Sequence, residues 1–280
     1  MTFDIRTVSF PSPGAPAEFA RSLSETGFAV LTDHPIAPDR IEATYAAWGG
    51  FFASEDKHDW LPDPARQDGY FPFRSEHAKG AMVKDLKEFY HVYPDGKVPG
   101  EVEGLTRALH SDLVAIGQTL LGWIEDHTPD EVRGRFSEPL PAMLEGSQQN
   151  LLRILHYPAL GQAPEPGAIR AAAHDDINLI TLLLAGSEPG LEAQDTAGNW
   201  RRVPCDPGMM AINVGDMLQM ASGGYYPSTT HRVVNPPAAR NVARFSMPMF
   251  LHPRPEVVLK PGTTAADYLN ERLREIGLKG

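Results

Sequence analysis

The chain has 280 residues and carries 25 basic side chains against 36 acidic ones, so its formal net charge is −11 at pH 7. Proteins that bind nucleic acid hold the phosphate backbone with dense Lys and Arg, so this balance excludes nucleic acid as the main partner. Hydrophobic residues make up 42% of the chain, enough to close a core, which excludes disorder as the main state. We expect one domain over residues 1–280.

A single cysteine, Cys205, excludes a disulfide within the chain. The first residues, MTFDIRTVSF, lack the basic start and the apolar stretch of a secretory signal. The most apolar segment, Ile177–Ala185, is far shorter than the roughly 20 residues that span a bilayer. The sequence therefore predicts a soluble cytoplasmic protein without a membrane partner, and it leaves the oligomeric state open.

The first half of the chain is predicted to be rich in helix. Apolar residues at helical spacing predict helices over Ala17–Thr26, Pro38–Phe52 and Gly104–Glu125, and a short strand is expected over Phe28–Leu31. Turns around QDGYFPF interrupt this pattern. We expect helices to dominate residues 1–145.

The second half changes to short apolar runs separated by turn clusters, which is typical of a β-rich barrel or sandwich. These runs are LLRILHY, INLITLLL, LEAQD, MMAINV, HRVVN and RFSMPMF. The tail returns to helix over Thr263–Ile276, with Thr264 and Asp267 at capping-box spacing. The sequence therefore predicts a mainly β fold with flanking helices, divided into a helix-rich part (1–145), a β core (146–255) and a C-terminal helix (256–280).

A candidate metal site comes from three residues in two predicted strands. The segment AAHDDINLI places His174 and Asp176 two apart, and side chains at i and i+2 of a strand share a face; His231 begins another short strand in STTHRVVNP. Two histidines and one carboxylate form a facial triad that leaves open positions on a divalent iron, as a catalytic site requires. Zinc accepts the same ligand types, and an H-x-D triplet alone is common in a chain with ten histidines.

A candidate anion site follows in ARFSMPMF, where Arg244 and Ser246 are two apart and share a face if the segment is a strand. A guanidinium group binds a carboxylate through two parallel hydrogen bonds, and a neighbouring hydroxyl adds a donor. The apolar neighbours Phe245 and Met247 favour a buried strand, in which an arginine requires an anion. The alternative is a surface arginine beside a solvated serine.

The stretches HDDINLITLLL, NVGDML, STTHRVVNP and RFSMP resemble the iron and cosubstrate motifs of the isopenicillin N synthase-like branch of 2-oxoglutarate-dependent iron(II) oxygenases. GFAVLTDHPI and DLKEFYHV resemble signatures of its amino-terminal half, so the resemblance covers nearly the whole chain. It implies a double-stranded β-helix, or jelly roll, framed by helices. It also implies His174, Asp176 and His231 as the iron ligands, and Arg244 and Ser246 as the site for the distal carboxylate of 2-oxoglutarate.

The same resemblance suggests further contacts. Tyr157 matches a family tyrosine that contacts the cosubstrate or substrate, and Phe250 matches a position that faces the substrate. Arg153 either meets a substrate carboxylate or makes a surface salt bridge. Three aromatic residues lie in segments that form the lid of the pocket, although aromatic side chains are often plain core packing; they are Tyr70, Phe73 and Tyr90.

The resemblance implies an enzyme that uses Fe(II), 2-oxoglutarate and O2 to oxidise, foremost by hydroxylation, a small organic substrate, while 2-oxoglutarate is decarboxylated to succinate. One alternative is an oxidase of the isopenicillin N synthase type, which uses Fe(II) and O2 without 2-oxoglutarate. Another is a non-catalytic jelly roll that binds a small ligand or a metal. Succinate formation separates the 2-oxoglutarate-dependent oxygenase from these two alternatives.

Overall fold

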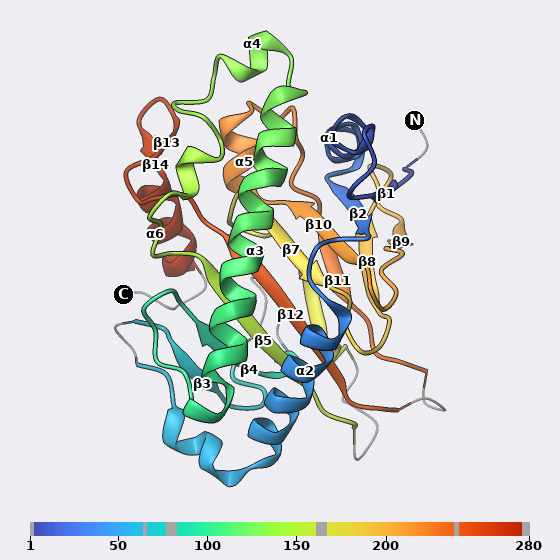
Figure 1. Cartoon of the computed structure of the whole chain (residues 1–280), viewed down its shortest axis with the longest axis vertical. Helices are drawn as coiled ribbons and strands as arrows, with labels where there is room; N and C mark the ends of the chain where they lie inside the picture. Colours follow the sequence, from blue (N-terminus) through green and yellow to red (C-terminus); the bar gives the residue numbers. More distant parts are fainter. Residues whose placement is uncertain (1–2, 64–65, 77–82, 161–166, 238–240, 276–280) are drawn as a thin grey trace.

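The computed structural model describes residues 3–63, 66–76, 83–160, 167–237 and 241–275 (Figure 1). Within these ranges the strands form a larger sheet, a smaller sheet and a two-stranded ribbon. The strands of the larger sheet, in spatial order, are β1 (Thr7–Ser9), β2 (Phe28–Thr32), β10 (Met210–Val214), β7 (Ile180–Leu184), β12 (Arg244–Leu251), β5 (Leu151–Tyr157), β4 (Glu88–Val92) and β3 (Gly69–Phe71). Those of the smaller sheet are β6 (Ala171–His174), β11 (His231–Val233), β8 (Leu191–Gln194) and β9 (Trp200–Arg202).

Helices surround this β core. The α-helices are α1 (Ala15–Thr26), α2 (Pro38–Ala53), α3 (Gly100–Asp126), α4 (Asp130–Arg133), α5 (Asp216–Ala221) and α6 (Ala265–Glu275). Two 3-10 helices, η1 (Glu55–Trp60) and η2 (Ala142–Leu144), and the ribbon of β13 (Val258–Lys260) and β14 (Thr263–Thr264) complete the elements. No helix in the described ranges is long and apolar enough to cross a membrane.

Two buried clusters cover the two faces of the larger sheet. In β2, Ala29 and Leu31 join a large core with the helices. Figure 1 shows α3 lying in front of β7 and β12 of the same sheet. Phe28 and Val30 point the other way and pack against Leu191 and other residues of the smaller sheet. Side chains that alternate between two buried faces make a strand apolar on both faces, as residues 28–31 of β2 are. The two sheets thus enclose a layer of buried side chains between them. This architecture confirms the predicted mainly β fold with flanking helices.

The prediction for residues 1–145 was incomplete, because four strands of that half, β1 to β4, join the larger sheet and only β2 was predicted. The QDGYFPF and KEFYHV segments contain β3 and β4, which pair antiparallel with each other, and β4 pairs with β5. Both faces of β4 are buried, so its sequence shows no clean alternation of polar and apolar residues. The β core therefore extends well outside residues 146–255.

The C-terminal helix begins later than predicted, because residues 258–264 form the ribbon and α6 begins at Ala265. The predicted capping box is confirmed. The Thr264 backbone N–H donates to Asp267 Oδ2 at 3.0 Å, and the Asp267 backbone N–H donates to Thr264 Oγ1 at 3.2 Å. The predicted end of this helix, Ile276, lies outside the described residues.

Replacing Thr264 with alanine removes the side-chain acceptor at the start of α6. We expect the free energy of unfolding to fall by about 1 kcal/mol, the usual contribution of a threonine N-cap. Urea denaturation measures this change. Thr119→Ala is the matched control, because Thr119 is an exposed residue inside α3 and caps no helix; an equal loss in both variants would contradict the capping role.

Candidate metal and anion site

Three side chains from two neighbouring strands converge on one point. His174 ends β6 and His231 begins β11, and the antiparallel register of these strands sets the two histidines opposite each other. Their ring centroids lie 4.4 Å apart. Asp176 Oδ1 lies 3.8 Å from His174 Nε2 and 3.7 Å from His231 Nε2. These three atoms are close enough together to bind a single metal ion.

Asp176 reaches this point by a different route from the predicted one. β6 ends at His174, so Asp176 lies in the following turn and not on the strand face. That turn is held by the Asp216 backbone N–H, which donates to the Asp176 carbonyl at 2.7 Å. Gly215 permits the approach, because a Cβ there would lie 2.2 Å from the Asn178 carbonyl oxygen. The neighbouring Asp175 is exposed.

Hydrogen bonds orient all three candidate ligands. Nδ1 of His174 lies 2.7 Å from the Ala172 carbonyl oxygen, and Nδ1 of His231 lies 3.1 Å from the Thr229 carbonyl oxygen. Since a carbonyl only accepts, each Nδ1 carries the proton and each Nε2 keeps its lone pair for a metal. Asp176 Oδ2 is hydrogen-bonded within the protein, which leaves Oδ1 as its free ligand atom.

The two donors to Asp176 Oδ2 come from adjacent strands of the larger sheet. Thr181 Oγ1 donates at 2.5 Å and Asn213 Nδ2 donates at 2.7 Å. β7 and β10 pair so that Thr181 and Asn213 stand directly opposite each other. Sequence analysis did not assign these two residues, although Asn213 lies in the quoted NVGDML motif. Their hydrogen bonds connect the Asp176 carboxylate, in the turn after β6 of the smaller sheet, to the larger sheet.

The electrostatics favour the protonation states that bind a metal. Burial lowers the pKa of the His174 imidazole, and the neighbouring His231 lowers it further. Burial alone would raise the pKa of Asp176, but the two histidines and the hydrogen bonds from Asn213 and Thr181 hold it below its usual value. A neutral imidazole and an ionised carboxylate are the ligand forms of these side chains.

Asn213→Ala removes one of the two donors that orient the Asp176 carboxylate. We expect the affinity for Fe(II) to fall by about 10- to 100-fold, the usual effect of losing such a partner. Anaerobic Fe(II) titration measures the change. Asn199→Ala is the control, because Asn199 bonds to Asp195 in the β8–β9 hairpin. Unchanged affinity in the Asn213 variant would refute an orienting role.

The candidate anion site lies on the inner face of β12. Arg244 and Ser246 stand opposite Tyr157 and Leu155 of β5, and both are buried, with 2% of each residue exposed. The Arg244 guanidinium carbon lies 5.2 Å from the centre of the Tyr157 ring. Within the described part of the chain, Arg244 Nη1 has no hydrogen-bond partner. The strand and the burial predicted for this segment are confirmed.

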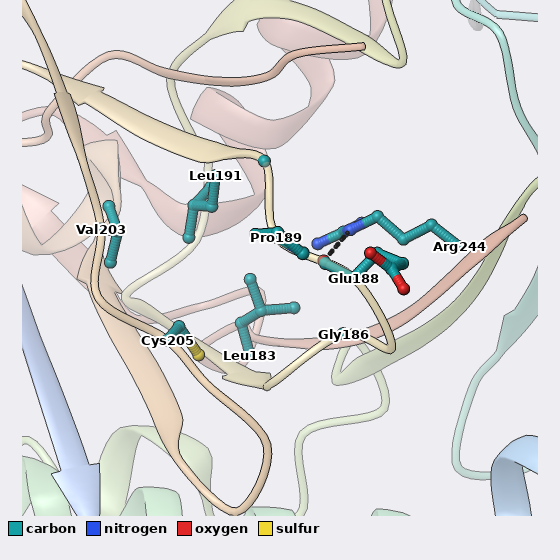
Figure 2. A pocket seen from close by; sticks show the side chains of 9 residues that line it. Leu183, Gly186, Glu188, Pro189, Leu191, Val203, Cys205 and Arg244 are labelled. Carbon is teal, nitrogen blue, oxygen red and sulfur yellow. Dashed lines mark hydrogen bonds between the residues drawn. The ribbon is translucent and has the colours of Figure 1, made fainter. Parts of the chain in front are cut away.

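The loop between β7 and β8 holds the guanidinium group of Arg244. Figure 2 shows the hydrogen bond from Arg244 Nε to the Glu188 carbonyl oxygen, which measures 2.8 Å. A Cβ at Gly186 would lie 2.9 Å from Arg244 Nη2, so only glycine leaves room for the group there. A small pocket opens beside it, lined in addition by Leu183, Pro189, Gly190, Leu191, Val203 and Cys205.

Two of the predicted substrate residues share this inner face. Arg153 and Phe250 stack together, with the guanidinium carbon 5.5 Å from the Phe250 ring centre. Phe89 lies against the same guanidinium group at 4.7 Å. Arg153 also forms an ion pair with Glu76 at 3.3 Å. Arg153 is thus a partly buried side chain in a mixed aromatic and ionic environment.

Two of the other three predicted substrate residues point away from the candidate site. Tyr70 and Tyr90 point to the helix-covered face, where both rings pack against Phe51. Phe73 is 41% exposed in the turn after β3. The pairing with β5 turns Phe89, and not Tyr90, toward the inner face, whereas the lid role of Phe73 stays a prediction.

An ion cluster near the site was also missed by sequence analysis. Lys87 is buried, and its Nζ lies 2.8 Å from Glu76 and 2.8 Å from Asp85. Asp85 Oδ1 accepts the backbone N–H of Ala172 at 3.0 Å, which links this cluster to the strand of His174. The alternation of the DLKEF motif was the available signal, since positions 85, 87 and 89 share a side.

Comparison with known proteins agrees with this geometry. The family model of the 2OG-Fe(II) oxygenase superfamily matches residues 149–253, which include the three convergent side chains and Arg244. The N-terminal model of the non-haem dioxygenase in morphine synthesis matches residues 12–108. The chain belongs to the 2OG-Fe(II) oxygenase superfamily. Members of this family require Fe(II), 2-oxoglutarate and O2, and their core is a jelly roll, as predicted for this chain.

Similar proteins extend over nearly the whole chain. A Shewanella oneidensis protein of known structure, described as an oxygenase, is 46% identical, with a TM-score of 0.89 over 98% of this chain and 99% of that one. Proline hydroxylase buaE of Petromyces alliaceus is 30% identical over 80% of this chain and 77% of its own length. Leucoanthocyanidin dioxygenase 1 of Oryza sativa subsp. indica is 29% identical over 84% of this chain, which spans 65% of that relative's length.

Proposed function

We propose that this chain is an Fe(II)- and 2-oxoglutarate-dependent oxygenase that oxidises, foremost by hydroxylation, a small organic molecule. The convergence of His174, Asp176 and His231, whose ligand atoms all lie within 4.8 Å of one another, supports this proposal most directly. Membership of the 2OG-Fe(II) oxygenase superfamily supports the choice of iron over zinc. We also propose a cytoplasmic location, in keeping with a single, free cysteine.

The residues fit the two groups that the family requires. His174 and His231 would each bind iron through Nε2, and Asp176 would bind it through Oδ1. These three leave adjacent positions open for other ligands. Arg244, with Ser246 and Tyr157, would bind the distal carboxylate of 2-oxoglutarate, because a buried guanidinium with an unpaired donor requires an anion. Iron, 2-oxoglutarate and O2 together would supply the oxidising chemistry, while the protein orients the reactants and excludes water.

The substrate would bind on the side of Arg153 and Phe250. Arg153 offers a guanidinium group whose Nε has no partner within the described residues and whose ion pair with Glu76 is longer than a charge-assisted hydrogen bond. A substrate with a carboxylate would compete for this group, and Phe250 and Phe89 would contact its apolar part. Two relatives are named for small organic molecules, a proline hydroxylase and a leucoanthocyanidin dioxygenase, which supports a substrate of this size.

A coupled assay tests the proposed function. The protein is loaded with Fe(II) and 2-oxoglutarate without oxygen, exposed to O2, and assayed for succinate with a panel of amino acids and other small carboxylic acids. Succinate released in proportion to oxidised substrate is the expected result. Oxygen consumption with 2-oxoglutarate left intact would favour the oxidase alternative. Absence of oxygen consumption with every substrate and no succinate would favour a non-catalytic binding protein.

A further inference from the structure

A second buried arginine lies close to the proposed carboxylate site. Arg170 directly precedes β6, the strand that ends at His174, and is 1% exposed. Its Nη2 donates to the Val242 carbonyl oxygen at 2.5 Å. Its Nε and Nη1 are buried without a hydrogen-bond partner, and within the described ranges no carboxylate forms an ion pair with it. Two donors of this cation are therefore unsatisfied.

Arg170 and Arg244 face the same aromatic ring. The Arg170 guanidinium carbon lies 5.8 Å from the centre of the Tyr157 ring, and that of Arg244 lies 5.2 Å from it. Burial lowers the pKa of Arg170, and the positive charge of Arg244 lowers it further, while Tyr157 and Glu188 act in the opposite direction. The like charges of these two arginines destabilise each other in the free protein.

Contact with an aromatic ring does not offset the free-energy cost of burying two guanidinium groups. A cation–π contact contributes about 0.5–2 kcal/mol, whereas removing an ion from water costs several kcal/mol. Several other arginines have a carboxylate or several carbonyls beside their charge: Arg153 pairs with Glu76, Arg254 pairs with Glu138, and Arg107 donates to three backbone carbonyls. Unpaired buried donors on two arginines beside one ring therefore point to an anionic ligand.

We propose that Arg170 is a second guanidinium group of the carboxylate site, so that Arg244 on β12 and Arg170 directly before β6, both beside the Tyr157 ring, bind one distal carboxylate of a 2-oxo dicarboxylic acid. This inference rests on the proposed function, because it takes 2-oxoglutarate as the ligand. Two cations for one carboxylate make the site strongly selective for 2-oxo acids that end in a carboxylate over those that end in a methyl group. Arg170 lies four residues before the candidate metal ligand His174.

Binding without turnover tests the role of Arg170. The protein is loaded with Mn(II) in the absence of oxygen and titrated calorimetrically with 2-oxoglutarate and, separately, with 2-oxopentanoate, which has the same chain length but no distal carboxylate. In Arg170→Gln we expect the Kd for 2-oxoglutarate to rise at least about tenfold, the loss expected for a charge-assisted hydrogen bond. The Kd for 2-oxopentanoate should stay unchanged, because this ligand has no group for Arg170 to bind.

Two further variants complete the design. Arg107→Gln is the matched control, since Arg107 lies in α3, donates to backbone carbonyls of the segment before this helix and pairs with Glu103; it should leave both Kd values unchanged. Arg170→Lys keeps the charge without the planar fork, so its Kd for 2-oxoglutarate should fall between those of the wild type and Arg170→Gln. This variant decides the question if the glutamine variant unfolds at a markedly lower temperature.

The outcomes separate this inference from the proposed function. If the Arg170 variants bind both 2-oxo acids more weakly by the same factor, Arg170 has a structural role and the inference alone is overturned. An unchanged Kd for 2-oxoglutarate would also overturn the inference alone. A wild-type protein that binds neither 2-oxo acid would overturn the proposed function and the inference with it. Selective loss of 2-oxoglutarate binding supports both.

Discussion

Asp176→Ala should abolish turnover and lower the affinity for Fe(II) by more than about 100-fold, since losing only a partner of a metal ligand already costs 10- to 100-fold. Asp176 is the only carboxylate in the convergent group, and its Oδ1 faces both imidazoles. Without it, two neutral histidines would remain, which bind a hard divalent ion weakly. Anaerobic Fe(II) titration and succinate release measure the two effects.

The neighbouring Asp175→Ala is the matched control for this prediction. Asp175 is exposed and lies next to Asp176 in the same turn, so its loss should leave both iron binding and turnover intact.

Asp176→Ala also leaves the donors of Thr181 and Asn213 without their acceptor, and we expect the metal-free protein to lose about 1–3 kcal/mol of stability. Iron affinity close to that of the wild type in the Asp176 variant would refute the three-ligand site.

Arg244→Ala should raise the KM for 2-oxoglutarate about 100-fold, with a smaller effect on kcat at saturation. The magnitude corresponds to two charge-assisted hydrogen bonds of about 1.5 kcal/mol each. A group that holds the far end of the cosubstrate contacts it equally before and during the reaction, so its loss acts on KM more than on kcat. Steady-state kinetics with varied 2-oxoglutarate measure both constants.

Arg201→Ala is the control for Arg244, because Arg201 is a largely exposed residue of β9 that pairs with Asp195. It should leave the KM for 2-oxoglutarate unchanged. A wild-type KM in Arg244→Ala would show that the distal carboxylate binds elsewhere. If kcat falls about 100-fold while the KM stays at the wild-type value, Arg244 instead positions the reacting groups.

The sequence identified the chemistry of the candidate site better than its geometry. Helical periodicity predicted α1, α2 and α3 within a few residues, because each buries one stripe of apolar side chains against the sheet. The inner face of β4 was not predictable in this way. Glu88, Phe89 and Tyr90 are all buried, so hydrophobicity does not tell which of them faces the site. Only the register with β5 decides this, and it turned the expected Tyr90 away.

The sequence by itself determined the family, the mainly β fold and the identities of His174, Asp176, His231, Arg244 and Ser246 as candidates, because motif spacing along the chain carries this information. The tertiary structure decided how they meet: Asp176 reaches the histidines from a turn tied to Thr181 and Asn213. It also brought Arg170 beside Arg244, although 74 positions separate them in the numbering (244 − 170). Such neighbours arise from strand pairings between distant segments, and local sequence patterns contain no record of them.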